Sequence, residues 1–268
     1  MRIDLLLTAL LFAVLLFAAA IGFAAQRRVH PRHISRETFD SIRLQMGMLI
    51  TFTALVLGLL TSSAKERYDG FSKLLSDYSA DLIELDHRLR VYGPDADAIR
   101  SKLRAYTAAA IADTWPGEPR PSGTYPAVTH APGAQGVESP TLGALLAEVD
   151  LGVQRLAPQD EFHRRIADRL SNRAADTIQT RWRLVLSAPS TLPWPFLLIL
   201  TAWLATIFGI FALTSPRDEL VYVVIVLSAL AIASPLYLIL DYSGALTGAL
   251  DLPSASMRAA LEHMDRAQ

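Results

Sequence analysis

The stretch MGMLITFTALVLGLLTSSA, residues 46 to 64, decides the fold of this chain. It is close to the ~20 residues that a helix needs to cross the hydrocarbon core of a bilayer, and it contains no Lys, Arg, Asp or Glu. Three further runs share these properties and span residues 5 to 25, 195 to 213 and 220 to 240. We therefore predict an all-α membrane protein with four transmembrane helices, arranged as one pair near each end of the chain.

The first run has features of a cleaved signal peptide, because Arg2 precedes it and small residues end it at Ala24 and Ala25. Its apolar stretch is longer than the ~7–15 residues of a signal peptide. Its many Leu, Ile, Val and Phe residues also favour stable insertion. We expect this run to remain as a spanning helix, so that residues 1 to 64 form a transmembrane hairpin and residues 193 to 241 form a second one.

Between the two hairpins, residues 65 to 192 are mostly polar and predict a helical extramembrane domain. The residues from 116 to 139 are rich in Pro, Gly, Ser and Thr and predict a flexible surface loop. Residues 242 to 268 predict a tail with a short helix from about Ser254. Apolar periodicity and capping residues predict the other helices, and these helices span residues 46 to 91, 95 to 115, 140 to 156 and 159 to 186.

The composition excludes several classes of function. The chain has no cysteine, so it has no disulfide, thiolate zinc site or iron–sulfur cluster. A net charge of −1 gives no reason to expect nucleic acid as a partner. No phosphate-binding glycine loop, nucleophile elbow or H-E-x-x-H motif occurs. We therefore predict no cofactor, no metal site and no enzymatic activity.

Small residues and threonines recur along one face of the second run. This face is made of Gly47, Thr51, Ala54, Gly58 and Thr61. Small residues allow membrane helices to approach closely, so one interpretation is a packing face, within the chain or between subunits. The other is a wall of a pore, because channels select and gate with rings of such residues.

The same seven-residue period continues beyond the membrane through Tyr68, Leu75, Leu82 and Leu89. Apolar residues at this spacing are typical of a coiled-coil seam. No proline or helix-stop signal separates these residues from the second run, which predicts one continuous helix. We interpret the four residues as a candidate oligomer seam.

Charged residues near the spans allow several interpretations. Five arginines in the first loop determine topology, contact anionic lipid headgroups or concentrate anions at a pore mouth, and they are Arg27, Arg28, Arg32, Arg36 and Arg43. His30 and His33 lie among them without a further ligand, so we predict no metal site there. The acidic file Asp77, Asp81 and Glu84 predicts a solvated helix face, with a cation-attracting vestibule as the alternative. Pro235 predicts a kink in the fourth span, and Asp241 marks its end.

Several short segments, in this order, are similar to those of one protein family. They are ALVLGLL at 54–60 with SAK at 63–65, LDHRL at 85–89 with YGP at 92–94, TRW at 180–182, WL at 203–204, SPR at 215–217, LILD at 238–241 and MRAAL at 257–261. Together they make the chain resemble the bacterial bestrophin-like membrane proteins. One departure concerns the turn after the fourth span, where relatives place a Pro-Phe pair and this chain has Tyr242 and Ser243.

The resemblance implies a four-span fold with a helical insert, and bestrophins themselves are pentameric anion channels whose second helices line the pore. It therefore implies a homo-oligomeric, anion-permeable channel in a bacterial inner membrane, with membrane lipid and small anions as partners. Bestrophin-like topology places the insert in the cytoplasm, whereas the arginines of the first loop favour an external N-terminus. The alternative function is a non-conducting scaffold or sensor that self-associates or binds a partner through its heptad helix.

Overall fold

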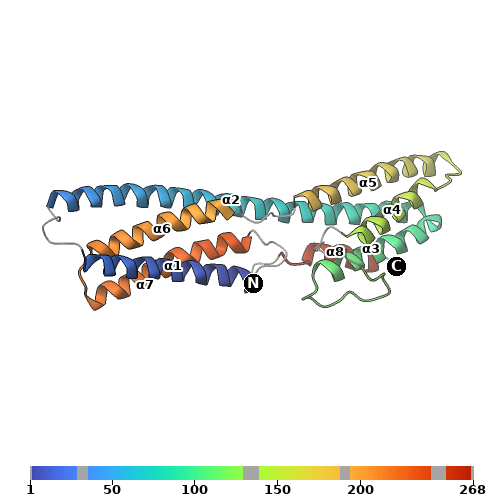
Figure 1. Cartoon of the computed structure of the whole chain (residues 1–268). Helices are drawn as coiled ribbons and strands as arrows, with labels where there is room; N and C mark the ends of the chain where they lie inside the picture. Colours follow the sequence, from blue (N-terminus) through green and yellow to red (C-terminus); the bar gives the residue numbers. More distant parts are fainter. Residues whose placement is uncertain (1, 29–35, 129–138, 188–193, 243–251, 267–268) are drawn as a thin grey trace. The chain divides into compact units, whose positions relative to one another are not determined.

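The computed structural model of the chain describes residues 2–28, 36–128, 139–187, 194–242 and 252–266, and all regular secondary structure in them is helical (Figure 1). The prediction of an all-α protein is confirmed. Four of the helices, α1, α2, α6 and α7, are long and apolar enough to cross a membrane. The chain divides into two compact units: unit 1 holds residues 1–68 and 189–250, and unit 2 holds residues 69–188 and 251–268.

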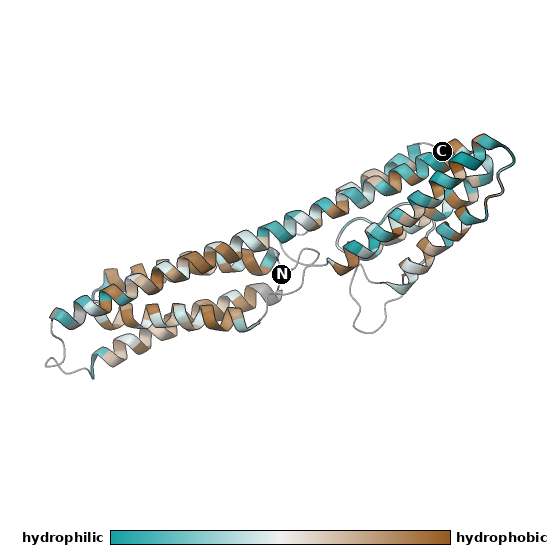
Figure 2. Cartoon of the chain, turned by 90° about the horizontal axis from the view of Figure 1, so that it is seen from above, coloured by the Kyte–Doolittle hydropathy of each residue, from teal (hydrophilic) through white to brown (hydrophobic). Residues whose placement is uncertain are grey.

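Unit 1 is built from α1 (Arg2–Gln26), the first part of α2 (Arg36–Tyr92), α6 (Trp194–Thr214) and α7 (Glu219–Tyr242). Apolar residues dominate these helices, as the brown colouring of Figure 2 shows. Helix α1 packs against both α6 and α7. Their shared core contains the buried residues Leu15, Ala19, Leu200, Leu204, Phe208, Ala212, Ile225, Ala229, Leu236 and Ile239.

Helices α1 and α6 cross closely in unit 1. A Cβ atom placed on Gly22 would lie 2.2 Å from the carbonyl oxygen of Gly209. Only glycine at position 22 allows the two backbones to come this close, as in other membrane helix crossings that use small residues. Beyond the crossing, Gln26 Nε2 donates to Ser215 O (3.0 Å) and Arg217 donates to Phe23 O (2.9 Å), which fixes the ends of both helices.

Unit 2 is built from the rest of α2, the 3-10 turn η2 (Pro94–Ala96), α3 (Asp97–Thr114), α4 (Pro140–Gln154), α5 (Glu161–Leu186) and α8 (Ala255–Arg266). Its core contains side chains with little or no exposure from each of these helices, including Leu82, Leu85, Leu103, Ile111, Val149, Leu170 and Met264. Helices α4 and α5 begin where Ser139 and Asp160 cap their free backbone N–H groups.

The C-terminal helix, which we expected in a separate tail, packs onto the insert helices. Its apolar face is buried through Met257, Ala260, Leu261 and Met264. Polar contacts hold the segment at both ends. Trp115 Nε1 donates to Leu252 O (2.6 Å), Glu118 accepts from Ser254 N (3.1 Å) and Arg258 Nε (2.9 Å), and Arg104 binds Asp265 through two nitrogens.

The predicted helices agree with the observed ones except at their ends. The second spanning helix begins at Arg36, ten residues before its apolar run, and continues to Tyr92 as expected from the heptad period. Residues 116–128 of the predicted loop contain no helix, and residues 129–138 lie outside the described part. Helix α7 runs through Pro235 without a break. Of the two residues that replace the Pro-Phe pair after Asp241, Tyr242 is the last residue of α7, and Ser243 lies outside the described part.

Candidate functional site

The face of α2 that carries the small residues is uncovered by the rest of its chain. Gly47, Thr51, Ala54 and Gly58 are exposed, and Thr61 is half-buried. Their spacing places them on one side of the helix. A different side of α2 carries the buried residues Met46, Thr53 and Ala64, and Ala64 belongs to the apolar core of unit 1.

The two glycines of this face have open space where a side chain would lie. Within the described part of the chain, a Cβ atom on Gly47 or Gly58 would meet no atom within 4 Å. This is unlike Gly22, where a Cβ would collide with the backbone of α6. Packing within the chain therefore does not explain why small residues occupy this side of α2, and the remaining interpretations are contact with another copy or with the contents of a pore.

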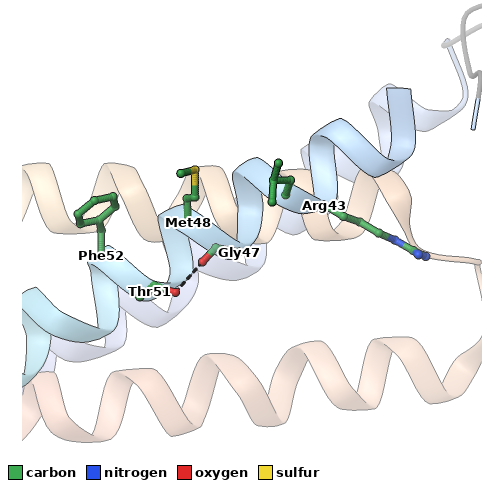
Figure 3. Close-up of a pocket in the computed structure, with 6 residues that line it drawn as sticks. Arg43, Gly47, Met48, Thr51 and Phe52 are labelled. Atoms are coloured by element: carbon green, nitrogen blue, oxygen red, sulfur yellow. Dashed lines mark hydrogen bonds between the residues drawn. The ribbon is translucent and has the colours of Figure 1, made fainter. Parts of the chain in front are cut away.

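The threonine hydroxyls of the face are satisfied within the helix. Thr51 Oγ1 donates to Gly47 O (2.8 Å), as drawn in Figure 3, and Thr61 Oγ1 donates to Leu57 O (2.8 Å). Each hydroxyl thus donates its hydrogen to a backbone carbonyl, and its oxygen lone pairs can still accept hydrogen bonds. The face can present polar oxygens without leaving a hydroxyl proton unsatisfied in the membrane.

A second stripe of large apolar residues lies beside the small one. Met48, Phe52, Leu55 and Leu59 are each about 60% exposed, at 60, 59, 58 and 62%. In Figure 3, Met48 and Phe52 point to the same side of α2. The exposed surface of α2 therefore consists of two adjacent stripes, a narrow one of small residues and a broad one of large apolar residues.

Arg43 stands one turn before Gly47, at the start of the face. Its side chain is exposed and lines a shallow hollow together with Leu44, Gly47, Met48, Thr51 and Phe52 (Figure 3). Among the other arginines of the first loop, Arg27 and Arg28 are exposed. Arg32 lies outside the described residues, as do His30 and His33. Among the arginines of the first loop whose side chains the structure describes, Arg43 lies directly beside the small-residue face.

The residues of the candidate oligomer seam lie in different surroundings. Tyr68 is half-buried and its ring contacts that of Tyr242, with centroids 5.1 Å apart. Leu75, Leu82 and Leu89 are only 7, 0 and 0% exposed in the single chain. Because the chain's own helices cover these leucines, they have no surface left for a second copy. The heptad period of α2 is accounted for in unit 2 by packing within the chain.

The acidic file is largely neutralised by neighbouring side chains. Asp81 accepts from Arg173 (3.1 Å) and Thr180 (2.9 Å) of α5, and Glu84 pairs with Arg88 at 2.6 Å. Asp77 is exposed. Asp81 therefore joins α2 to α5, and Glu84 is paired within α2. These contacts do not favour a cation-attracting vestibule.

Sequence reasoning missed two buried polar clusters of unit 2. Asp86 is 1% exposed and accepts from Arg90 (2.8 Å) and Arg100 (3.1 Å). Arg181 is 6% exposed and donates to Ser139 O (3.3 Å). The spacing of four between Asp86 and Arg90 signalled one of these contacts, whereas the others join helices that are distant in sequence.

The tyrosines of α2 and α3 form a further buried contact. Tyr78 and Tyr106 share a hydrogen bond between their hydroxyls, and both rings are almost fully buried. Burial raises the pKa of Tyr106 above its usual value, which keeps the phenol protonated. In the described residues, no three His, Cys, Asp or Glu side chains gather as metal ligands would.

Comparison with known proteins places this arrangement in a family. No curated protein matches the chain. Among solved structures, a variant of a bacterial Bestrophin homolog from Klebsiella pneumoniae has a TM-score of 0.66 at 16% identity, covering 97% of this chain and 96% of that chain. A second variant of that homolog has a TM-score of 0.62 at 16% identity, covering 95% and 97%. A structure described as a membrane protein has a TM-score of 0.63 at 15% identity, covering 96% and 97%.

These likenesses show that the fold of the whole chain is shared with bacterial bestrophin homologues. The predicted resemblance is confirmed at the level of the sequence family as well. Residues 13–257 match the Bestrophin-like domain, which is most of the chain. The chain is therefore a multi-pass membrane protein that belongs to the bestrophin-like family.

Proposed function

We propose that this chain is one subunit of a homo-oligomeric ion channel whose pore is lined by the uncovered face of α2. The observation that carries the proposal is that Gly47, Thr51, Ala54 and Gly58 are exposed in the chain and serve no packing within it. Small side chains leave room along a central axis, and threonine oxygens offer polar contacts to water in a region otherwise lined by hydrocarbon. Thr61 continues the face towards unit 2.

We propose that the pore passes anions, and the residue that supports this is Arg43. The hydroxyls of Thr51 and Thr61 donate to the backbone and so have no proton to offer an anion. The exposed guanidinium of Arg43, next to Gly47, provides positive charge instead. Repeated around an axis, it would form a ring that raises the local concentration of anions at the mouth of the pore.

The assembly that we propose is a ring of identical subunits in the inner membrane of a bacterium, with five copies by analogy with bestrophins and with unit 2 in the cytoplasm. The uncovered sides of α2 face the axis and the neighbouring copy. The alternative function is a non-conducting scaffold or sensor that self-associates or binds a partner through its heptad helix. It has less support, because the chain's own helices cover Leu75, Leu82 and Leu89.

Thiol accessibility tests the proposal directly, because the chain has no cysteine of its own. Thr51→Cys and Gly58→Cys channels reconstituted in liposomes should lose their anion current when a charged, membrane-impermeant thiol reagent is added. Phe17→Cys is a matched control, because Phe17 is 67% exposed on α1 and lies outside the proposed pore face. The reagent should leave its current unchanged. Native mass spectrometry gives the subunit number.

Two results would overturn the proposal. The first is purified protein that forms a folded oligomer and passes no ion in any salt. The second is equal block at Phe17→Cys and Thr51→Cys, because it would mean that α2 has no special place along the ion path. Replacement of Arg43 by Gln tests the anion preference separately and should shift the reversal potential towards that of a non-selective pore.

A further inference from the structure

The end of α5 exposes two large apolar residues, and the exposed surface of the helix from Arg164 to Gln179 has none. Trp182 is 51% exposed and Leu186 is 81% exposed. They are four residues apart and therefore lie on the same side of the helix. The remaining exposed residues of α5 between Arg164 and Gln179 are charged, polar or small, namely Arg164, Arg165, Asp168, Arg169, Asn172, Ala175, Asp176 and Gln179.

The indole of Trp182 is held in place rather than left loose. The guanidinium of Arg181 lies 5.6 Å from the centroid of the ring. Arg181 is itself fixed, because it is buried and donates to Ser139 O at the start of α4. A cation held near an aromatic ring restrains its orientation. Arg181 thus restrains the ring of the exposed Trp182, which is expected if the ring binds a partner outside the chain.

Charge and chain length indicate which partner this is. No acidic residue follows Asp176 in α5, and Arg183 is exposed beside Trp182. Seven residues separate Leu186 from Trp194, where the spanning helix α6 begins. Eight extended steps reach at most about 29 Å, so the end of α5 cannot be far from the membrane surface. Trp at the headgroup level, a Leu beside it and a basic side chain that can reach a phosphate are the combination that a lipid interface favours.

We propose that the last turns of α5 form a membrane-interface anchor. Trp182 and Leu186 lie among the lipid headgroups, and Arg183 contacts lipid phosphate. The anchor fixes the membrane-proximal end of unit 2 on the lipid surface. It depends on the membrane spans and not on conduction, so it stands whether or not the chain is a channel.

Single cysteines test the anchor, because each label is unique in a chain without native cysteine. Leu186→Cys and Trp182→Cys variants carry an environment-sensitive fluorophore and are reconstituted in vesicles of zwitterionic and anionic phospholipid. One set of vesicles is brominated close to the headgroup and another at the end of the acyl chain. Phe162→Cys is the matched control, because Phe162 is 61% exposed on the same helix, about 36 Å before Leu186 at ~1.5 Å per residue.

The labels at positions 182 and 186 should lose most of their fluorescence to bromine near the headgroup and less to bromine at the chain end. The label at position 162 should lose none. Labels at 182 and 186 that resist both brominated lipids would overturn the anchor. Red emission in that case would place them in water, and blue emission would place them against a second copy of the chain. Equal quenching at all three positions would also overturn it.

Discussion

One helix, α2, carries the same seven-residue period through two stretches that have opposite surroundings. In its first stretch, Gly47 and Ala54 are exposed, and none of the described residues covers them. In its later stretch, Leu82 and Leu89 are fully buried by the chain's own helices. The period alone predicts that a face exists in both stretches. Whether that face is covered within the chain depends on which other helices lie beside it.

The covered stretch of α2 carries leucine at this period, and the uncovered stretch carries small residues. Leucine is suited to a covered face, because burying its side chain contributes roughly 1.5–3 kcal/mol. Glycine gains nothing from burial, and in a helix it costs about 1 kcal/mol relative to alanine. Gly47 and Gly58 therefore destabilise the helix, and packing within the described part of the chain does not offset this cost. The proposed pore, or a neighbouring subunit, would account for glycine at these two positions.

The strongest test of the covered stretch is Leu82→Ala. Leu82 has no exposed surface, so the change should leave a cavity and reduce the free energy of unfolding by roughly 2–5 kcal/mol. Thermal unfolding of the detergent-solubilised protein, followed by Trp fluorescence and circular dichroism, measures the loss. Leu151→Ala is the matched control, because Leu151 is 47% exposed in the same unit. A melting temperature equally lowered by both changes would contradict the contrast.

A somewhat smaller loss is expected for Gly22→Ala, at the covered crossing of unit 1. The new Cβ would lie 2.2 Å from Gly209 O, and a backbone carbonyl cannot move aside as a flexible side chain can. The two helices should separate, at a cost of roughly 1–3 kcal/mol. Unfolding by titration with a denaturing detergent measures it. If Gly22→Ala is as stable as the wild-type protein, α1 and α6 do not cross as closely as described.

The sequence predicts the four spans because hydropathy and helix length are local properties. It does not predict that α2 begins at Arg36, since four of residues 36–45 are charged and hydropathy carries no signal for a mostly polar segment of helix. The heptad period predicts the continuous helix to Tyr92 and the apolar face of its later stretch. It does not reveal what covers this face, because the covering helices follow much later in the chain.

In the candidate site, too, local sequence predicts some features and tertiary packing determines the others. The spacing of Gly47, Thr51, Ala54 and Gly58 is sufficient to predict one face. That the face is uncovered follows only from the positions of α1, α6 and α7, which no local pattern contains. Asp86 illustrates the opposite case, because its contact with Arg90 is local and its contact with Arg100 depends on how α3 folds back. That the face of α2 lines a pore stays a prediction.

A third change asks whether polar contacts, as well as leucines, hold the covered part of the chain together. Hydrogen bonds from the Ser254 hydroxyl, and then from Ser254 N and Arg258, lower the pKa of Glu118 below its usual range. A carboxylate that is bound more tightly when ionised stabilises the docked α8 above the usual pKa of glutamate. This stabilisation disappears as the pH falls through the lowered pKa.

Glu118→Gln should therefore loosen α8 by roughly 1 kcal/mol at neutral pH, a modest value because the Glu118 side chain is 32% exposed. Hydrogen exchange of the α8 amides measures the protection. In the wild-type protein it should decrease in acid, and in Glu118→Gln it should depend on pH much less. Equal protection and equal pH dependence in the two proteins would show that apolar contacts of α8 are sufficient.

The smallest effect on folding is expected on the uncovered face, with Gly58→Ala. The added methyl group meets no atom of the chain within 4 Å, and alanine favours a helix over glycine by up to about 1 kcal/mol. The solubilised subunit should therefore unfold at the same temperature as the wild-type protein or slightly above it. The same methyl group, repeated in every copy, narrows the proposed pore and should lower the conductance of the reconstituted protein. A variant that unfolds more easily but conducts normally would reverse the contrast, because Gly58 would then be a packing residue of its own chain.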